Sequence, residues 1–176
     1  MRLLTKTSLL SFILLISSPT ITAAPAPEKP LLQAKDIIQQ VKERGVNPVV
    51  AELGEQGERD KIAYRITTGD PEWINVAFKL LPSMKNDFTQ QILNSLSFAL
   101  INNPVKVLEL AKKHNLLSSN DICTIPSTLV NTKEKQQYIR KVAASLKAAE
   151  KSAGRQDKQN IEICQQELAL FYIQFL

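Results

Sequence analysis

Apolar residues recur through most of this chain at intervals of three and four, the spacing that collects side chains on one face of an α-helix. From Thr132 to Ser152 this face consists of Tyr138, Val142, Leu146 and Ala149. Near the C-terminus it consists of Ile161, Cys164, Leu168, Phe171 and Phe175, and Asp157 is placed to cap that helix. The pattern therefore predicts two long amphipathic helices at the end of the chain.

Shorter helices are predicted upstream by the same spacing and by residues that begin or end helices. One covers Leu31 to Arg44, and Gly45 is placed to end it. Pro71 to Leu81 is apolar on nearly every side, which predicts a helix buried among others. A further helix is capped by Asp87 and buries Phe88, Ile92, Leu96 and Ala99. Another runs from Pro104 to His114, and a loop is expected from Ser118 to Ser127.

Three Asx-Pro pairs occur between the predicted helical segments, at Asn47-Pro48, Asp70-Pro71 and Asn103-Pro104. In each pair we expect the first side chain to cap a helix and the proline to occupy the first helical position. Residues 61–67 alternate apolar and polar side chains, which also suits a strand. Because a lone strand would have no partner for its backbone, we interpret this segment as helical.

These elements predict an all-α fold, a single domain over residues 31–176 in which antiparallel helices form an irregular array. The array is loosely like an armadillo or HEAT solenoid, because similar heptamers begin at Asn47 and Asn103. The Asx-Pro pairs lie 23 residues apart from 47 to 70 and 33 apart from 70 to 103. These unequal intervals argue against a regular repeat.

One stretch of the chain carries a family resemblance. Gly69-Asp70-Pro71-Glu72-Trp73, then Ala99-Leu100 and Asn102-Asn103-Pro104-Val105, resembles a family of uncharacterised exported all-helical bacterial proteins. The resemblance covers mainly residues 69–108 and lies in helix caps and core positions. It implies export and helicity, and it implies no activity.

The N-terminus has the pattern of a secretory signal peptide. Arg2 and Lys6 precede an apolar run over residues 8–16, and small residues follow at Thr22, Ala23 and Ala24. We expect cleavage after Ala23, which makes 1–23 the signal peptide and 24–30 a proline-rich tether. The mature chain is then periplasmic or secreted. No transmembrane segment is expected in it, because its apolar stretch over residues 168–176 is too short to cross a membrane.

Charge narrows the range of partners. The chain has 22 basic and 17 acidic side chains, and removal of Arg2 and Lys6 leaves 20 and 17, a net charge of +3. This excess is too small for a nucleic-acid-binding protein, so no nucleic acid is expected. Basic side chains gather between 133 and 158, where they form a candidate face for an anionic partner or simply the solvated outside of an amphipathic helix. They are Lys133, Lys135, Arg140, Lys141, Lys147, Lys151, Arg155 and Lys158.

Cys123 and Cys164 are the only cysteines, and in an exported chain such a pair is most simply a disulfide. Two buried free thiols are one alternative. A zinc ion held by both cysteines and His114 is another, although the usual Cys-x-x-Cys spacing is missing. His114 is the only histidine and falls at a helix end, where it suits the helix dipole. We expect neither a metal nor a cofactor.

The sequence contains few features that are typical of an enzyme. No glycine-rich phosphate loop, His-Glu-x-x-His or Gly-x-Ser-x-Gly motif occurs, and no catalytic residue is assigned. A pair of carboxylates could cleave a cell-wall glycan if two acids met in a pocket, or the acids could simply form a solvated face. The acids in question are Glu52, Glu55, Glu58, Asp60, Asp70 and Glu72.

The last helix carries a second apolar stripe of Ile163, Leu170 and Ile173 beside the buried one. This stripe predicts a face for a partner helix or a second copy, unless the helix is central and packed all round. The expected function is that of a soluble, exported protein-binding module, with an envelope inhibitor or immunity-type protein as a concrete subtype. The alternatives are a carboxylate-dependent cell-wall hydrolase and a peripheral protein whose basic helix binds anionic lipid.

Overall fold

Helices form almost all of the regular structure in the computed structural model, which describes residues 33–53, 56–83 and 87–174. No strand occurs among these residues, so the all-α prediction is confirmed. The elements are α1 (Ala34–Arg44), α2 (Val46–Glu52), α3 (Gln56–Thr67), α4 (Pro71–Leu80), the 3-10 turn η1 (Leu81–Ser83), α5 (Asp87–Ala99), α6 (Pro104–His114), α7 (Ser119–Ile122), α8 (Thr132–Glu150) and α9 (Arg155–Gln174). The predicted signal peptide and tether lie outside the described residues.

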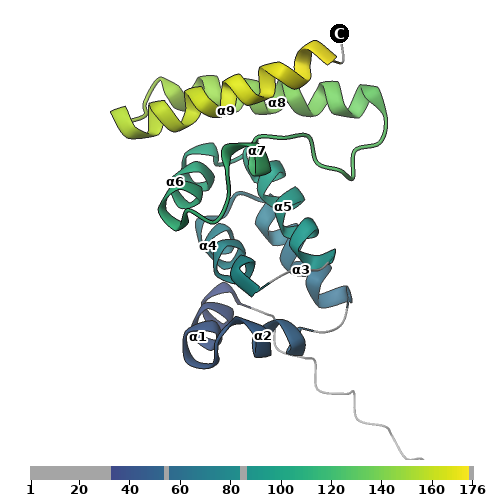
Figure 1. Cartoon of the computed structure of the whole chain (residues 1–176), viewed down its shortest axis with the longest axis vertical. Helices are drawn as coiled ribbons and strands as arrows, with labels where there is room; N and C mark the ends of the chain where they lie inside the picture. Colours follow the sequence, from purple (N-terminus) through teal and green to yellow (C-terminus); the bar gives the residue numbers. More distant parts are fainter. Residues whose placement is uncertain (1–32, 54–55, 84–86, 175–176) are drawn as a thin grey trace, which may run out of the picture. The chain divides into compact units, whose positions relative to one another are not determined.

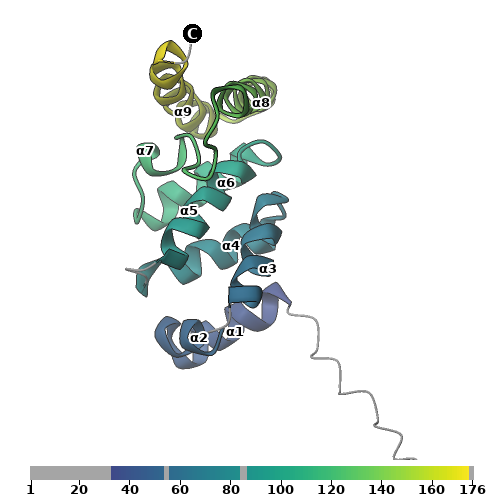
Figure 2. The ribbon, with the colours of Figure 1, turned by 90° about the vertical axis from the view of Figure 1, so that its right-hand side faces the viewer.

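The helices stack in successive pairs. Figures 1 and 2 show α1 and α2 at one end of the described body and the pair α8 and α9 at the other. Between them, α1 packs on α4, α4 on α6 and α6 on α9, while α3 packs on α5 in a second row. This arrangement is the irregular helical array that the sequence predicts.

The core is continuous and is built from the predicted stripes. Phe88, Ile92, Leu96 and Ala99 of α5 are all buried, as are Tyr138, Val142 and Leu146 of α8. In α4 every large apolar side chain except Trp73 is buried, because α1, α3 and α6 all contact this helix. Ile62 and Ile66 of α3 are fully buried, which confirms the helical interpretation of residues 61–67.

Two of the three Asx-Pro predictions are confirmed. The Asp70 carboxylate accepts hydrogen bonds from the backbone amides of Glu72 and Trp73, at 2.8 and 3.3 Å. The Asn103 side chain accepts one from the amide of Lys106 at 3.2 Å. Each side chain thus caps a helix whose first residue is proline.

The prediction for Asn47 is wrong. Gly45, at φ 83°, ends α1 and also begins α2, so the second helix starts at Val46. Asn47 is therefore already helical, and Pro48 lies in the first turn, where a missing N–H removes no helical hydrogen bond. Glycine at a positive φ allowed the helix to begin two residues earlier than the Asx-Pro pattern indicates.

Three other boundaries differ from the sequence-based expectation. α9 begins at Arg155, so Asp157 lies in its first turn and does not cap it, although a carboxylate there still suits the helix dipole. α5 begins at Asp87 itself. The expected loop from Ser118 to Ser127 contains the one-turn helix α7, which a capping box between Ser118 and Asp121 holds in place.

The Cys123–Cys164 disulfide is present, with a Cα–Cα distance of 5.3 Å. Cys123 directly follows α7 and Cys164 lies on the buried face of α9, so the bond ties the loop before α8 to the last helix. Neither cysteine is left as a thiol, which removes the zinc alternative.

Candidate protein-binding surface

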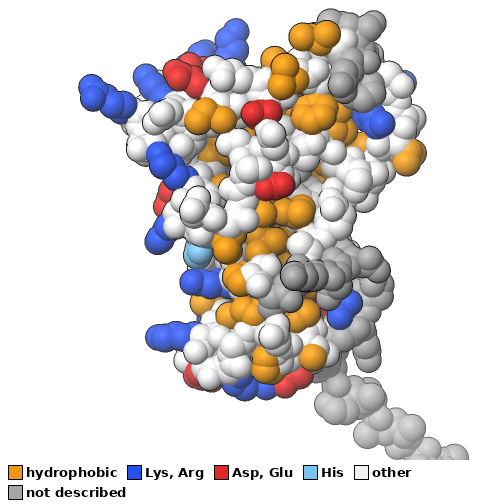
Figure 3. Space-filling model, in the orientation of Figure 1, with side chains coloured by type: hydrophobic (Ala, Val, Ile, Leu, Met, Phe, Trp, Pro, Cys, Tyr) orange, Lys and Arg blue, Asp and Glu red, His pale blue; other side chains and the backbone are white. Residues whose placement is uncertain are grey.

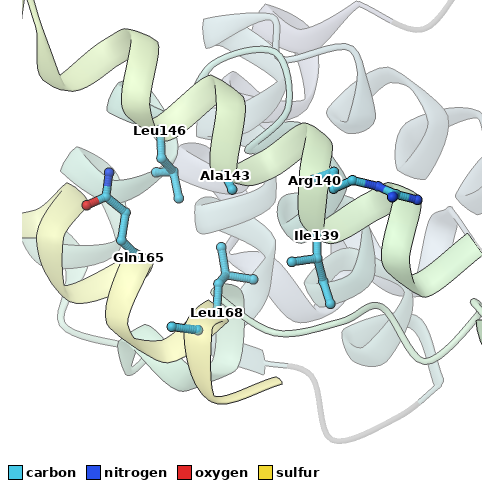
Figure 4. Close-up of a pocket in the computed structure, with 7 residues that line it drawn as sticks. Ile139, Arg140, Ala143, Leu146, Gln165 and Leu168 are labelled. Atoms are coloured by element: carbon cyan, nitrogen blue, oxygen red, sulfur yellow. The ribbon is translucent and has the colours of Figure 1, made fainter. Parts of the chain in front are cut away.

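An apolar groove runs between α8 and α9 at the end of the helix array. It has a volume of about 340 Å³ and is lined by Ile139, Arg140, Ala143, Leu146, Gln165, Leu168 and Ala169. Figure 4 shows Ile139 and Leu168 pointing into the space between the two helices, whereas Arg140 extends away from them. The floor of the groove is formed by Ile139, Leu146 and Leu168, which are buried. Its walls include the exposed alanines Ala143 and Ala169.

A row of cations runs along α8 on this side of the helix, and one of them, Arg140, lines the groove. Lys133, Arg140 and Lys147 are seven residues apart, which returns each side chain to nearly the same face of α8, and Lys151 follows just after the helix ends on the same side. All four are exposed. We call these four residues the cationic stripe. It lies next to Ala143, on the side of α8 that faces away from the core.

The structure does not bring the other four predicted cations onto this face. Lys141 lines a different pocket with Phe98 and Tyr138, on the opposite flank of α8. Arg155 and Lys158 lie together at the start of α9. Lys135 is half-buried on α8. The predicted basic surface is thus divided by the packing of the last two helices.

The second apolar stripe of α9 is exposed, with 37% of Ile163, 63% of Leu170 and 73% of Ile173 accessible to solvent. α9 is therefore an outer helix that is open on this side. Ile163 lines a pocket of about 290 Å³ with Leu108 and Leu117, so it faces α6 and the loop before α7 and not the α8–α9 groove. In Figure 3, hydrophobic side chains follow α9 toward its C-terminal end, and basic side chains gather at its beginning.

His114 has a packing role. Its ring stacks on Phe78, with centroids 5.7 Å apart and planes at 10°. Burial lowers the pKa of His114, and the charges of Lys79 and Lys113 lower it further. A lowered pKa disfavours the charged imidazolium, which weakens the charge–dipole interaction that the sequence suggested.

The acids considered for hydrolysis have separate partners. The Glu52 carboxylate accepts a hydrogen bond from the Arg44 guanidinium at 2.7 Å, which lowers the pKa of Glu52. Asp60 accepts from the Gln91 amide at 2.6 Å, Glu58 pairs with Lys61, and Asp70 caps α4. Glu72 is exposed, and Glu55 lies outside the described residues. In five pockets of the described part of the chain, at most one carboxylate lines the wall.

Sequence reasoning missed the groove itself. Leu146 and Leu168 of its floor belong to the predicted stripes and Ile139 does not, and the pattern on one helix does not show which residues of another helix lie opposite. Ala143 and Ala169 are exposed, but Ala144 and Ala148 of α8 are exposed as well, so alanines in the sequence do not by themselves mark the groove.

No protein-family model, curated protein or solved structure matches the chain. Among the described residues, none of the helices combines the length and hydrophobicity that crossing a membrane requires. Function is therefore inferred from the geometry and chemistry of the surface.

Proposed function

We propose that the chain is an exported protein-binding module whose α8–α9 groove binds an amphipathic helix of another exported protein, with acidic residues beside its apolar face. The observation that supports this proposal is the position of the cationic stripe directly beside an apolar groove. An apolar stripe of a partner helix would fill the groove, and its acids would meet Arg140 and Lys147.

The small walls of the groove suit a helix in particular. Ala143 and Ala169 project little beyond the backbone, so an incoming helix can approach both α8 and α9 closely. The outer face of α8 and α9 presents these alanines beside an apolar groove, which favours a further helix at this position.

Charge argues for an acidic partner over a second copy of this chain. Two copies joined through this face would bring the Lys133, Arg140, Lys147 and Lys151 side chains of both copies close together. Like charges in a desolvated interface cost free energy and slow association. With an acidic partner, the same four cations instead lower the free energy of the complex and speed association, most strongly at low salt.

An inhibitor or immunity-type protein of the cell envelope is the subtype that we favour, because such a protein needs export, a rigid scaffold and one exposed docking face. The disulfide supports an oxidising compartment. The same cations could bind anionic lipid headgroups, and the test below separates lipid from protein.

The test places a photocrosslinking amino acid at Gln166, an exposed position of α9 beside the groove, in living cells. We expect one discrete protein adduct, which Ala143→Trp abolishes by filling the groove and Ala143→Ser retains. The same crosslinker at Lys35 of α1 should give no such adduct. No adduct at Gln166, an adduct with a second copy of the chain, or adducts only with lipid would each overturn the proposal.

A further inference from the structure

A second surface, between α3 and α5, has different chemistry. Its groove has a volume of about 430 Å³, within the range of small-molecule sites, and Thr128 of the loop before α8 closes one side. Tyr64 and Thr67 of α3 face Gln90, Gln91 and Asn94 of α5 across it. These two helices pack side by side in Figure 1.

The polar groups that line this groove are all neutral. Amides and hydroxyls supply them, and none of the nine lining residues carries a charge, although 22% of the whole chain is charged. An amide carries two donor hydrogens and an acceptor oxygen, of which contacts within the protein use a part, and each hydroxyl offers one donor and two lone pairs. Such a lining matches a neutral ligand that is rich in hydroxyl groups.

Hydrogen bonds within the protein hold these amides in place, and the weakest joins the Gln90 amide to the Asn94 carbonyl at 3.4 Å. The Asn94 amide donates to the Ser127 hydroxyl at 3.0 Å, and the Asn94 carbonyl accepts from the Ser127 backbone amide at 3.0 Å. The Gln91 amide donates to Asp60 at 2.6 Å. Groups fixed in advance lose less conformational entropy on binding, which favours affinity for a small ligand.

Tyr64 completes the site. Tyr64 lines the groove and is 69% exposed. An exposed aromatic ring provides a flat apolar platform beside polar groups. The C–H face of a pyranose ring stacks on such a platform, while the sugar hydroxyls reach the neighbouring amides.

We infer that the α3–α5 groove is a binding site for a neutral oligosaccharide, with Tyr64 as the stacking residue and Gln90, Gln91 and Asn94 as hydrogen-bonding residues. The inference is independent of the proposed protein-binding function, since the two grooves share no residue. An exported protein with both sites would bind a glycan through one surface and a protein through the other.

The test is a titration of the purified chain, followed by the amide resonances of its asparagine and glutamine side chains in ¹⁵N NMR spectra. The probes are chitotetraose and maltotetraose, with a tetrasaccharide of uronic acids and a proline-rich peptide as competing classes. We expect saturable shifts of Gln90, Gln91 and Asn94 with at least one neutral probe. We expect weaker binding of the uronic acid probe and of the peptide.

Variants then separate stacking from folding. Tyr64→Ala should weaken binding about tenfold, while Tyr64→Phe keeps the ring and should stay close to the parent chain. Ala143→Trp, in the other groove, should bind the sugar normally. The inference is overturned if neither neutral probe gives saturable shifts, if the uronic acid or the peptide binds more tightly, or if a folded Tyr64→Ala chain binds as well as the parent.

Discussion

Gly69 and Asn102 lie close together where the turn between α3 and α4 packs against the turn between α5 and α6. A Cβ atom at position 69 would lie 2.6 Å from the Cβ of Asn102. The Asn102 amide donates to the carbonyl of Thr67 and the Asn103 amide to that of Gly69, both at 3.0 Å. The turn before α4 is therefore joined directly to the turn before α6, which fixes how successive helix pairs stack.

Gly69→Ala should lower the free energy of unfolding by about 2 kcal/mol or more, because φ at this position is +78° and the new methyl group would overlap Asn102. Urea denaturation measures this loss. Gly57→Ala is the matched control, since Gly57 lies in α3 with no atom within 4 Å of a new Cβ, and alanine should be neutral or stabilising there. Equal losses in both variants would contradict the role assigned to this turn.

The difference between the two asparagine-proline pairs gives a second prediction. Asn103→Ala should cost about 1–2 kcal/mol, because it removes the cap of α6 and the hydrogen bond to Gly69. Asn47→Ala should cost a few tenths at most, because Asn47 is exposed and caps nothing. If denaturation showed Asn47→Ala to be the more costly change, the described start of α2 would be wrong.

Removal of the disulfide should destabilise the chain without changing its helices. Cys123 and Cys164 are 41 positions apart, and closure of a loop of that length is worth about 4 kcal/mol in the chain-entropy model. The Cys123→Ala/Cys164→Ala variant should therefore unfold at lower urea concentration, while circular dichroism stays helical. A variant as stable as the oxidised parent would show that the bond does not hold α9 in place.

The buried hydroxyl of Tyr138 leads us to expect that the free energy of unfolding falls at alkaline pH. The single hydrogen of this hydroxyl is shared between the carbonyls of Ser97 and Thr124, at 3.0 and 3.1 Å, and burial raises the pKa of Tyr138 well above the ordinary value of 10.0. Since the folded-state pKa is the higher one, this contribution is complete below pH 10 and is lost as the pH rises above it. Tyr138→Phe should lower stability at neutral pH by about 1–3 kcal/mol and flatten the alkaline decline. An unchanged alkaline slope in denaturation curves would contradict this assignment.

The helices could be predicted from the sequence where apolar stripes are long, as in α5 and α8, or where Asp70 and Asn103 mark a start. The start of α2 could not, because the positive φ of Gly45 follows from the local path of the chain. Neither groove could be predicted in detail. Ala143 and Ala169 line one groove, and Tyr64 and Gln90 line the other. The members of each pair come from different helices, so no spacing in the sequence indicates that they lie close together.

The most direct test of the central claim uses the partner segment found by crosslinking at Gln166, prepared as a peptide. Its affinity for the purified chain is measured over a series of salt concentrations, for the parent, for Arg140→Glu/Lys147→Glu and for Lys35→Glu/Lys42→Glu on α1. The account predicts that salt weakens binding to the parent, that the α8 variant binds at least tenfold more weakly with less salt dependence, and that the α1 variant binds like the parent. Equal affinities for all three proteins would contradict a protein-binding site at the α8–α9 groove.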